Sequence, residues 1–136
     1  MFVLGTGNHS AGWRYHGASA SNSSRPVLEE IAQIAERGKF DLFFVSDGLA
    51  MDIGDHPSFI TRFEPLTLIS ALSMITKHIG LGATVSTSFD EPFHVARAFA
   101  SIDHLSGGRA AWNVVTSTSD KSALNFSKDR LAEHDL

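Results

Sequence analysis

Polar side chains able to hold a ligand by hydrogen bonds lie at the ends of four short apolar runs in this sequence. They are Thr6, then Ser46 and Asp47, then Thr84 and Ser86, and finally Asn113 with Thr116 and Ser117. If the runs are parallel strands, their carboxyl ends share one edge, which is where ligands bind in α/β folds. The alternative is that these residues cap helices or fill turns, as Asp, Ser and Thr often do. Convergence of all four groups favours a ligand site.

His9 follows the first apolar run directly, on the expected ligand side, and is our candidate for a catalytic contact with substrate or cofactor. The seven histidines include no pair at the His-x-x-x-His spacing of a helical metal site. The nearest approach to a metal cluster is Asp52, Asp55 and His56, in a stretch of loop composition. We therefore expect no metal.

Several sharper motifs are absent. Gly5-Thr6-Gly7 lacks the third glycine of the dinucleotide fingerprint, and the sequence contains no P-loop and no Gly-x-Ser-x-Gly elbow. Gly107-Gly108-Arg109 lies between an expected helix and an expected strand, on the side away from the polar ends. We interpret it as a structural turn and not as a phosphate loop.

Strands and helices alternate along the chain. The apolar runs predict strands at 2–5, 41–46, 79–85 and 110–115, and the intervening helices are expected to begin at Pro26, Pro65 and Pro92. Apolar strands that alternate with helices indicate parallel pairing with helical crossovers. In the first helix, Val27, Ile31, Ile34 and Ala35 fall on one face at helical spacing.

Composition narrows the class of protein. The chain has 136 residues, 43% of them hydrophobic, a formal charge of −4 and no basic block, which argues against nucleic acid as a partner. It has no cysteine, which excludes disulfides, thiolate zinc sites and a cysteine nucleophile. No apolar run is long enough for a membrane span, and no signal peptide is visible, so a cytoplasmic location is expected.

Seven sequence blocks follow one another in an order typical of a known family. The blocks are Phe43–Asp47, Phe63–Leu68, Ile79–Thr87, Glu91–Arg97, Phe99–Arg109, Trp112–Ser117 and Asn125-Phe126. Together they resemble the bacterial luciferase-like flavin monooxygenases. The similarity is to the branch with nitrilotriacetate, dibenzothiophene-sulfone and long-chain alkane monooxygenases, and the block at 106–116 (Ser-Gly-Gly-Arg-x-x-Trp-Asn-x-Val-Thr) is highly specific for it.

This resemblance implies a (β/α)₈ barrel in which reduced FMN, supplied by a separate NAD(P)H:flavin reductase, activates O2 to oxidise a small organic substrate. By position it implies that Asp47, Thr84, Asn113 and Thr116 contact the flavin. It places His9 near the polar residues on the substrate side. Hydroxyl and amide groups suit the pyrimidine edge of the flavin, while the redox chemistry belongs to the cofactor.

The length departs from the family pattern. A complete barrel needs about 250 residues, so we expect residues 1–136 to be a single partial domain, the N-terminal half of the barrel, truncated at its C-terminus. The loops after the late strands, which usually bind phosphate, would then be missing, and the chain alone is expected to be inactive. Two alternatives stay open: a non-catalytic remnant or half-barrel that needs a partner, and a deazaflavin-dependent reductase of the same fold.

A partial barrel also predicts exposed apolar surface. Its two open sheet edges and its uncovered inner face would expose Phe2, Phe44, Leu81 and Trp112. Self-association and weak FMN binding are therefore expected of the purified chain.

Overall fold

A computed structural model of the chain describes residues 1–4, 7, 9, 11–19, 21–51 and 60–132. The expected positions Thr6, Asp52, Asp55 and His56 lie outside the described residues. After a short 3-10 helix at Gly12–Arg14, helices and strands alternate. In chain order they are α1 (Arg25–Arg37), β1 (Leu42–Val45), α3 (Pro65–Ser73), β2 (Gly80–Ser86), α4 (Pro92–Ser106), β3 (Ala110–Val115) and α5 (Asp120–Leu124).

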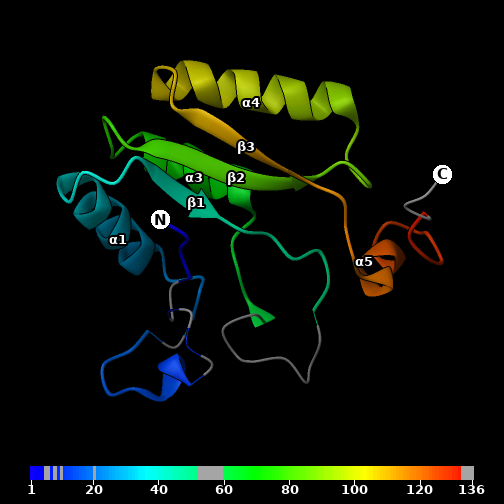
Figure 1. The fold of residues 1–136 in the computed structure, drawn as a ribbon, viewed down its shortest axis with the longest axis horizontal. Helices are drawn as coiled ribbons and strands as arrows, with labels where there is room; N and C mark the ends of the chain where they lie inside the picture. The colour runs from blue at the N-terminus through cyan, green and yellow to red at the C-terminus, as the bar shows by residue number, and fades with distance from the viewer. Residues whose placement is uncertain (5–6, 8, 10, 20, 52–59, 133–136) are drawn as a thin grey trace.

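The three strands form one parallel sheet in the order β1-β2-β3. All three run toward the side of the molecule where α5 lies (Figure 1). A helix lies between each strand and the next, as parallel pairing requires. The sequence predictions for these three strands and for their parallel pairing are thereby confirmed.

The first predicted strand is reduced to a single bridge. Phe2 pairs in parallel with Phe44, which adds this segment to the free side of β1. Among the described residues, Val3 N donates to the Phe44 oxygen at 3.0 Å, Phe44 N donates to the Met1 oxygen at 2.8 Å, and the Met1 amino group donates to the Leu42 oxygen. The prediction of adjacency is confirmed, but residues 2–4 form a bridge and not the predicted strand, because so few ladder bonds do not define one. Position 5 of that prediction lies outside the described residues.

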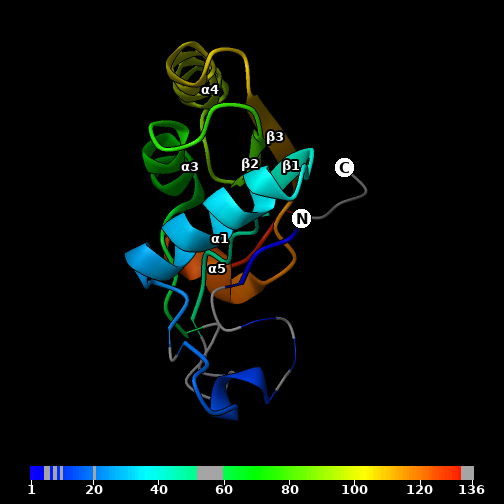
Figure 2. The same cartoon turned by 90° about the vertical axis from the view of Figure 1, so that its left-hand side faces the viewer.

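The helices cover one face of the sheet. In Figure 2, α3 and α4 lie together on one side of the strands. Their apolar residues join those of α1 and of the strand residues that point toward them in one buried cluster. Its members are Val3, Leu28, Ala32, Ala35, Phe43, Val45, Leu68, Ile69, Leu72, Ile79, Leu81, Ala83 and Ile102.

The two faces of the sheet are thus unequal, and this corrects the expectation for Leu81. Leu81 is fully buried, at 0% exposure, because strand alternation turns it toward the helices. Phe2 is 43% exposed, and its ring lies 5.6 Å from that of Phe44. Trp112 is 40% exposed but packs against Phe99 of α4, so it belongs to the helical side.

Each long helix begins as predicted. Proline occupies the first turn of α1, α3 and α4, where its missing N–H has no intrahelical partner to lose. The buried face of α1, however, consists of Leu28, Ala32 and Ala35, while Ile34 is 50% exposed. The predicted and the observed faces share Ala35 and are adjacent on the helix, and the observed face is the one with the fully buried alanines.

Arg109 joins the turn before β3 to the end of α3. Its Nε donates to the Ser106 oxygen at 2.6 Å, and its Nη atoms donate to four acceptors in the segment Ser73–Ile79. Gly107 and Gly108 adopt left-handed φ angles of 72° and 85°, which lets α4 end and the chain reverse into β3. The Gly-Gly-Arg motif is therefore the structural turn that the sequence analysis expects.

Glu36 fixes α1 to the entrance of β2. Its Oε1 accepts hydrogen bonds from the backbone N–H groups of Lys77, His78 and Ile79, at 2.7, 2.6 and 3.1 Å. Burial raises the pKa of Glu36, but these three bonds outweigh it and the pKa falls to about 2. The carboxylate thus acts as a clamp between α1 and the loop before β2.

Among the described residues, no helix combines the length and apolar composition that a membrane crossing requires.

We predict that R109K destabilises the fold by about 2 kcal/mol, the usual scale for hydrogen bonds to a charged group. Lysine keeps the charge but loses the planar fork that serves several acceptors at once. Urea unfolding would measure the change. R97K, on the exposed surface of α4, is the matched control. Equal stability losses in the two variants would contradict the assigned role of Arg109.

We predict that E36Q lowers the melting temperature at neutral pH and that this difference disappears in acid. Because the folded-state pKa of Glu36 is below its unfolded value, its contribution is present above about pH 4.3 and is lost as the pH falls toward 2. Thermal melts from pH 7 to pH 2 would test this, with E30Q on the exposed side of α1 as control. A difference independent of pH would show that the carboxylate charge is irrelevant.

Candidate functional site

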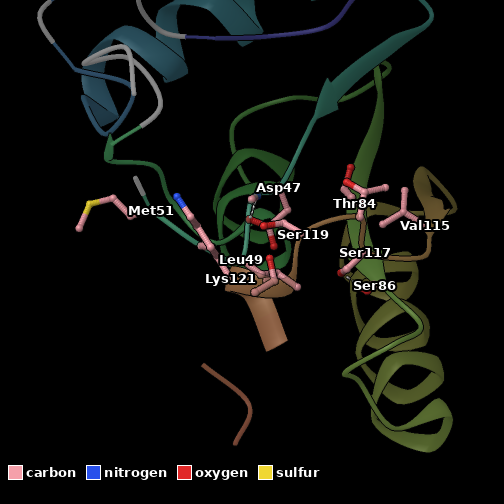
Figure 3. A pocket seen from close by; sticks show the side chains of 13 residues that line it. Asp47, Leu49, Met51, Thr84, Ser86, Val115, Ser117, Ser119 and Lys121 are labelled. Carbon is pink, nitrogen blue, oxygen red and sulfur yellow. Dashed lines mark hydrogen bonds between the residues drawn. The ribbon is translucent and has the colours of Figure 1, made fainter. Parts of the chain in front are cut away.

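A cleft of about 420 Å³ opens at the carboxyl ends of the three strands. This volume falls in the usual range of small-molecule sites, roughly 300–1,000 Å³. Figure 3 shows side chains of β2 and β3 on one wall and side chains of the segment after β1 and of α5 on the other. The lining residues are Asp47–Met51, Thr84, Ser86, Val115, Ser117–Ser119, Lys121 and Ser122.

Thr84 and Asn113 form the centre of the polar strand ends. The two residues are direct partners in the parallel register of β2 and β3. The Asn113 Nδ2 donates to the Thr84 Oγ1 at 3.0 Å, and that hydroxyl donates to the Val45 oxygen at 3.1 Å. One chain of hydrogen bonds therefore crosses all three strands. Thr84 is 6% exposed, so its hydroxyl is fixed, whereas Asn113 is exposed and can offer its amide to a ligand.

Gly80 at the start of β2 lets this strand lie close to the start of β1. A Cβ at Gly80 would lie 2.9 Å from the Asp41 oxygen and 3.1 Å from the Leu42 Cδ1. A side chain at this position would push β1 away from β2. Gly80 thus keeps β1 and β2 close at one end, and at the other end the Thr84 hydroxyl bonds to the Val45 oxygen across the same pair of strands.

Asp47 is the acidic residue of the cleft and follows β1 directly. Burial raises the pKa of Asp47 above its ordinary value, and the nearby carboxylates Glu64 and Asp90 raise it further. The hydrogen bond from Gly48 N to its Oδ1, at 2.7 Å, and the charge of Arg62 act in the opposite direction. Ionised Asp47 is therefore held in surroundings that disfavour its charge, as often occurs at functional sites.

Serine side chains hold together the wall of the cleft that follows β2 and β3. The Ser86 and Ser117 hydroxyls lie 2.8 Å apart, and the Ser88 Oγ accepts from Ser117 N at 3.4 Å. These bonds tie the loop after β2 to the segment after β3. The polar residues of the rim thus serve two purposes, since some brace the loops while others face the cleft.

The structure brings together three of the five predicted site residues. Asp47 and Thr84 line the cleft, and Asn113 is bonded to Thr84 beside it. Thr116 is exposed and does not line the cleft, although its neighbours Val115 and Ser117 do. His9 is also exposed and outside the described lining, and its Nδ1 accepts from Ala11 N at 3.0 Å.

Sequence reasoning missed Lys121. Lys121 and Asp47 are the two charged residues of the described lining, and Lys121 comes from α5. The segment after Thr116 is polar and weakly patterned, so no periodicity signalled a helix there. In the part of the chain that the structure describes, no three His, Asp or Glu side chains are grouped to hold a metal ion.

A parallel sheet of βα units with a polar cleft at its carboxyl edge is the ligand-binding arrangement of α/β proteins. The comparisons with known proteins agree and are more specific. The model of the family described as luciferase-like monooxygenase matches residues 2–135. The chain belongs to the luciferase-like monooxygenase family.

Three similar proteins place it within that family. N-acetyl-S-(2-succino)cysteine monooxygenase of Bacillus subtilis (strain 168) is 53% identical over all of this chain and 31% of its own length. The structure of EDTA monooxygenase from Chelativorans sp. BNC1 has a TM-score of 0.90 and 32% identity, covering 98% of this chain and 31% of that one. The structure of riboflavin lyase with modified FMN and riboflavin has a TM-score of 0.75 and 31% identity, covering 84% and 28%.

These figures confirm the resemblance and the fold class inferred from the sequence. They also show that the chain spans about a third of the length of the curated relatives it matches. Luciferase-like monooxygenases generally use reduced flavin.

We predict that D47N stabilises the fold at pH 7. Because the folded-state pKa of Asp47 is raised, its protonated form favours folding below the ordinary aspartate value of about 3.9, and this advantage is lost as the pH rises through the raised pKa. At neutral pH the variant lacks the unfavourable charge, and at pH 3 the two proteins should be equal. Urea unfolding at both pH values would measure this, with D41N on the exposed surface as control. Destabilisation by D47N at pH 7 would contradict it.

Proposed function

We propose that this chain builds the flavin-ring contacts of a monooxygenase that uses reduced FMN and O2 to oxidise a small organic substrate. The observation that carries the proposal is the grouping of Asp47, Thr84 and Asn113 at the carboxyl edge of the sheet. Family membership and the FMN named with the riboflavin lyase structure support the choice of cofactor.

The residues present fit a flavin ring. Its pyrimidine edge carries both N–H donors and carbonyl acceptors, so it needs partners of both kinds. One of the two N–H groups on the Asn113 Nδ2 donates to Thr84, so the second N–H can donate to a ring carbonyl and the amide oxygen can accept from a ring N–H. Asp47 offers a second acceptor across the cleft. Bound reduced flavin supplies the electrons for oxygen activation.

The chain's own residues hold and orient the ring. The Thr84 hydroxyl fixes the Asn113 amide, because it is itself anchored on the Val45 oxygen. The ionisation of Asp47 is expected to respond to a bound ligand, because burial already raises the pKa of this carboxyl group. Entry of a flat ligand would remove water from this carboxyl group and favour its protonated form.

The proposed partners follow from the same chemistry. We propose a separate NAD(P)H:flavin reductase as the source of reduced FMN, because a relative that is 40% identical is named as one component of its system, nitrilotriacetate monooxygenase component A. His9 stays in the proposal as the catalytic contact, although its side chain lies outside the described lining. Thr116, which the family resemblance implies as a flavin contact, also lies outside that lining, and the proposal gives it no contact with the ring. The variants below separate Thr116 from the three grouped residues.

Flavin titration tests the proposal. We expect saturable quenching of FMN fluorescence with a Kd of roughly 0.1–1 mM, or about −4 to −5.5 kcal/mol. Riboflavin should bind with similar affinity, since the assigned contacts address the ring. T84V and N113A should each weaken binding by roughly fivefold to tenfold, the effect of losing one hydrogen bond of ordinary net strength.

T116V is the matched control, because it removes a hydroxyl at the same edge of the sheet but outside the cleft. Equal losses in T116V and T84V would show that the contacts are wrongly assigned. Absence of any saturable signal up to about 1 mM FMN would overturn the proposal, because binding would then be weaker than about −4 kcal/mol.

A further inference from the structure

The segment after β3 reaches back across the cleft to the loop after β1. Asn125, which ends α5, donates from its Nδ2 to the Leu49 oxygen at 2.8 Å, joining positions 76 residues apart. Leu49 belongs to the cleft wall and is two residues from Asp47. The bond therefore connects the end of α5 to the loop that follows β1 and carries Asp47.

The same segment is fastened to the loop after β2. The rings of Phe126 and Phe89 are stacked, with centroids 4.3 Å apart and an angle of 7° between their planes. The Lys128 Nζ donates to the Ser88 oxygen at 3.0 Å and lies 5.3 Å from the centre of the Phe89 ring. Residues 120–128 thus touch both other loops of the carboxyl edge, and we name them the clasp.

The turn of the clasp is held in an unfavourable backbone conformation. Ser127 has a left-handed φ of 57°, and Lys128 N donates to the Ala123 oxygen at 3.0 Å around it. A non-glycine residue is uncommon in this region and persists where the surrounding contacts hold it. The strained turn aims Asn125, Phe126 and Lys128 at separate partners.

We propose that Asn125 is a positioning residue for the flavin cleft, which acts by holding the 47–51 loop so that Asp47 faces the ligand. The inference rests on the proposed function for its ligand but not for its geometry. It explains why an asparagine and a phenylalanine adjoin in the chain: the amide anchors one loop and the ring anchors the other. Neither side chain needs to touch the cofactor.

N125A provides the test, and L124A is its control, because Leu124 is exposed on the same helix end and its side chain takes no part in the bond from Asn125 to Leu49, which we call the tether. The first measurement is hydrogen exchange of the Gly48 amide, which donates to Asp47. We expect N125A to accelerate this exchange by roughly fivefold or more, as loss of one hydrogen bond implies. L124A should leave it unchanged.

The second measurement is FMN affinity, together with its pH dependence. N125A should weaken binding by roughly fivefold and shift the pH midpoint of binding downward, because a released Asp47 becomes better solvated. N125D, which keeps the size but not the donor, should behave like N125A. K128A, which leaves the Leu49 bond intact, should leave the Gly48 exchange rate unchanged.

The two proposals can fail separately. Unchanged Gly48 exchange in N125A would overturn the positioning role of Asn125, whatever the flavin result. Faster exchange without weaker binding in N125A would overturn it as well, by showing that the loop position does not matter to the ligand. If the unaltered chain binds no flavin while N125A exchanges faster, the proposed function fails and the tether stands.

Discussion

The guanidinium of Arg109 sets the geometry on which the site depends. It binds carbonyls at the end of α3 and the Ile79 oxygen just before β2, while the Arg109 oxygen accepts from Leu81 N at 2.8 Å. The first residues of β3 are therefore placed against β2 in one register. Since strand side chains alternate, a slip of one residue would turn Asn113 away from Thr84. A structural arginine at one end of the sheet thus fixes a polar pair at the other.

The two ends of the sheet use charge in opposite ways. At the amino end, Glu36 is stabilised by three donors and its pKa is lowered to about 2, so its charge supports the fold. At the carboxyl end, burial raises the pKa of Asp47, so its charge opposes the fold. Carboxyl groups with raised pKa values are frequent at functional sites. This contrast separates the residues that stabilise the sheet from those of the candidate site.

The face of the sheet opposite the helices links the fold to the family. Phe2 and Phe44 lie together there, beside the glycines of β2, and Phe2 is well exposed. In a complete barrel this face is the filled interior. The chain spans about a third of its relatives, and its described strands form an open sheet of three. The cleft is formed from loops at the sheet edge, so it exists without the barrel interior.

The sequence alone determined the local elements, because their causes are local. Apolar runs defined β1, β2 and β3, prolines marked the starts of three helices, and Gly107 with Gly108 marked the end of α4. The convergence of strand ends in parallel sheets predicted that the polar residues would gather at one edge, and the family resemblance singled out Asp47, Thr84, Asn113 and Thr116 among them. Tertiary structure alone decided the buried face of α1, in which Ala32 and Ala35 are buried while the larger Ile34 stays exposed. It also decided the contact of Asn125 with Leu49, since a bond across 76 residues depends on how three loops pack and leaves no periodic trace in the sequence.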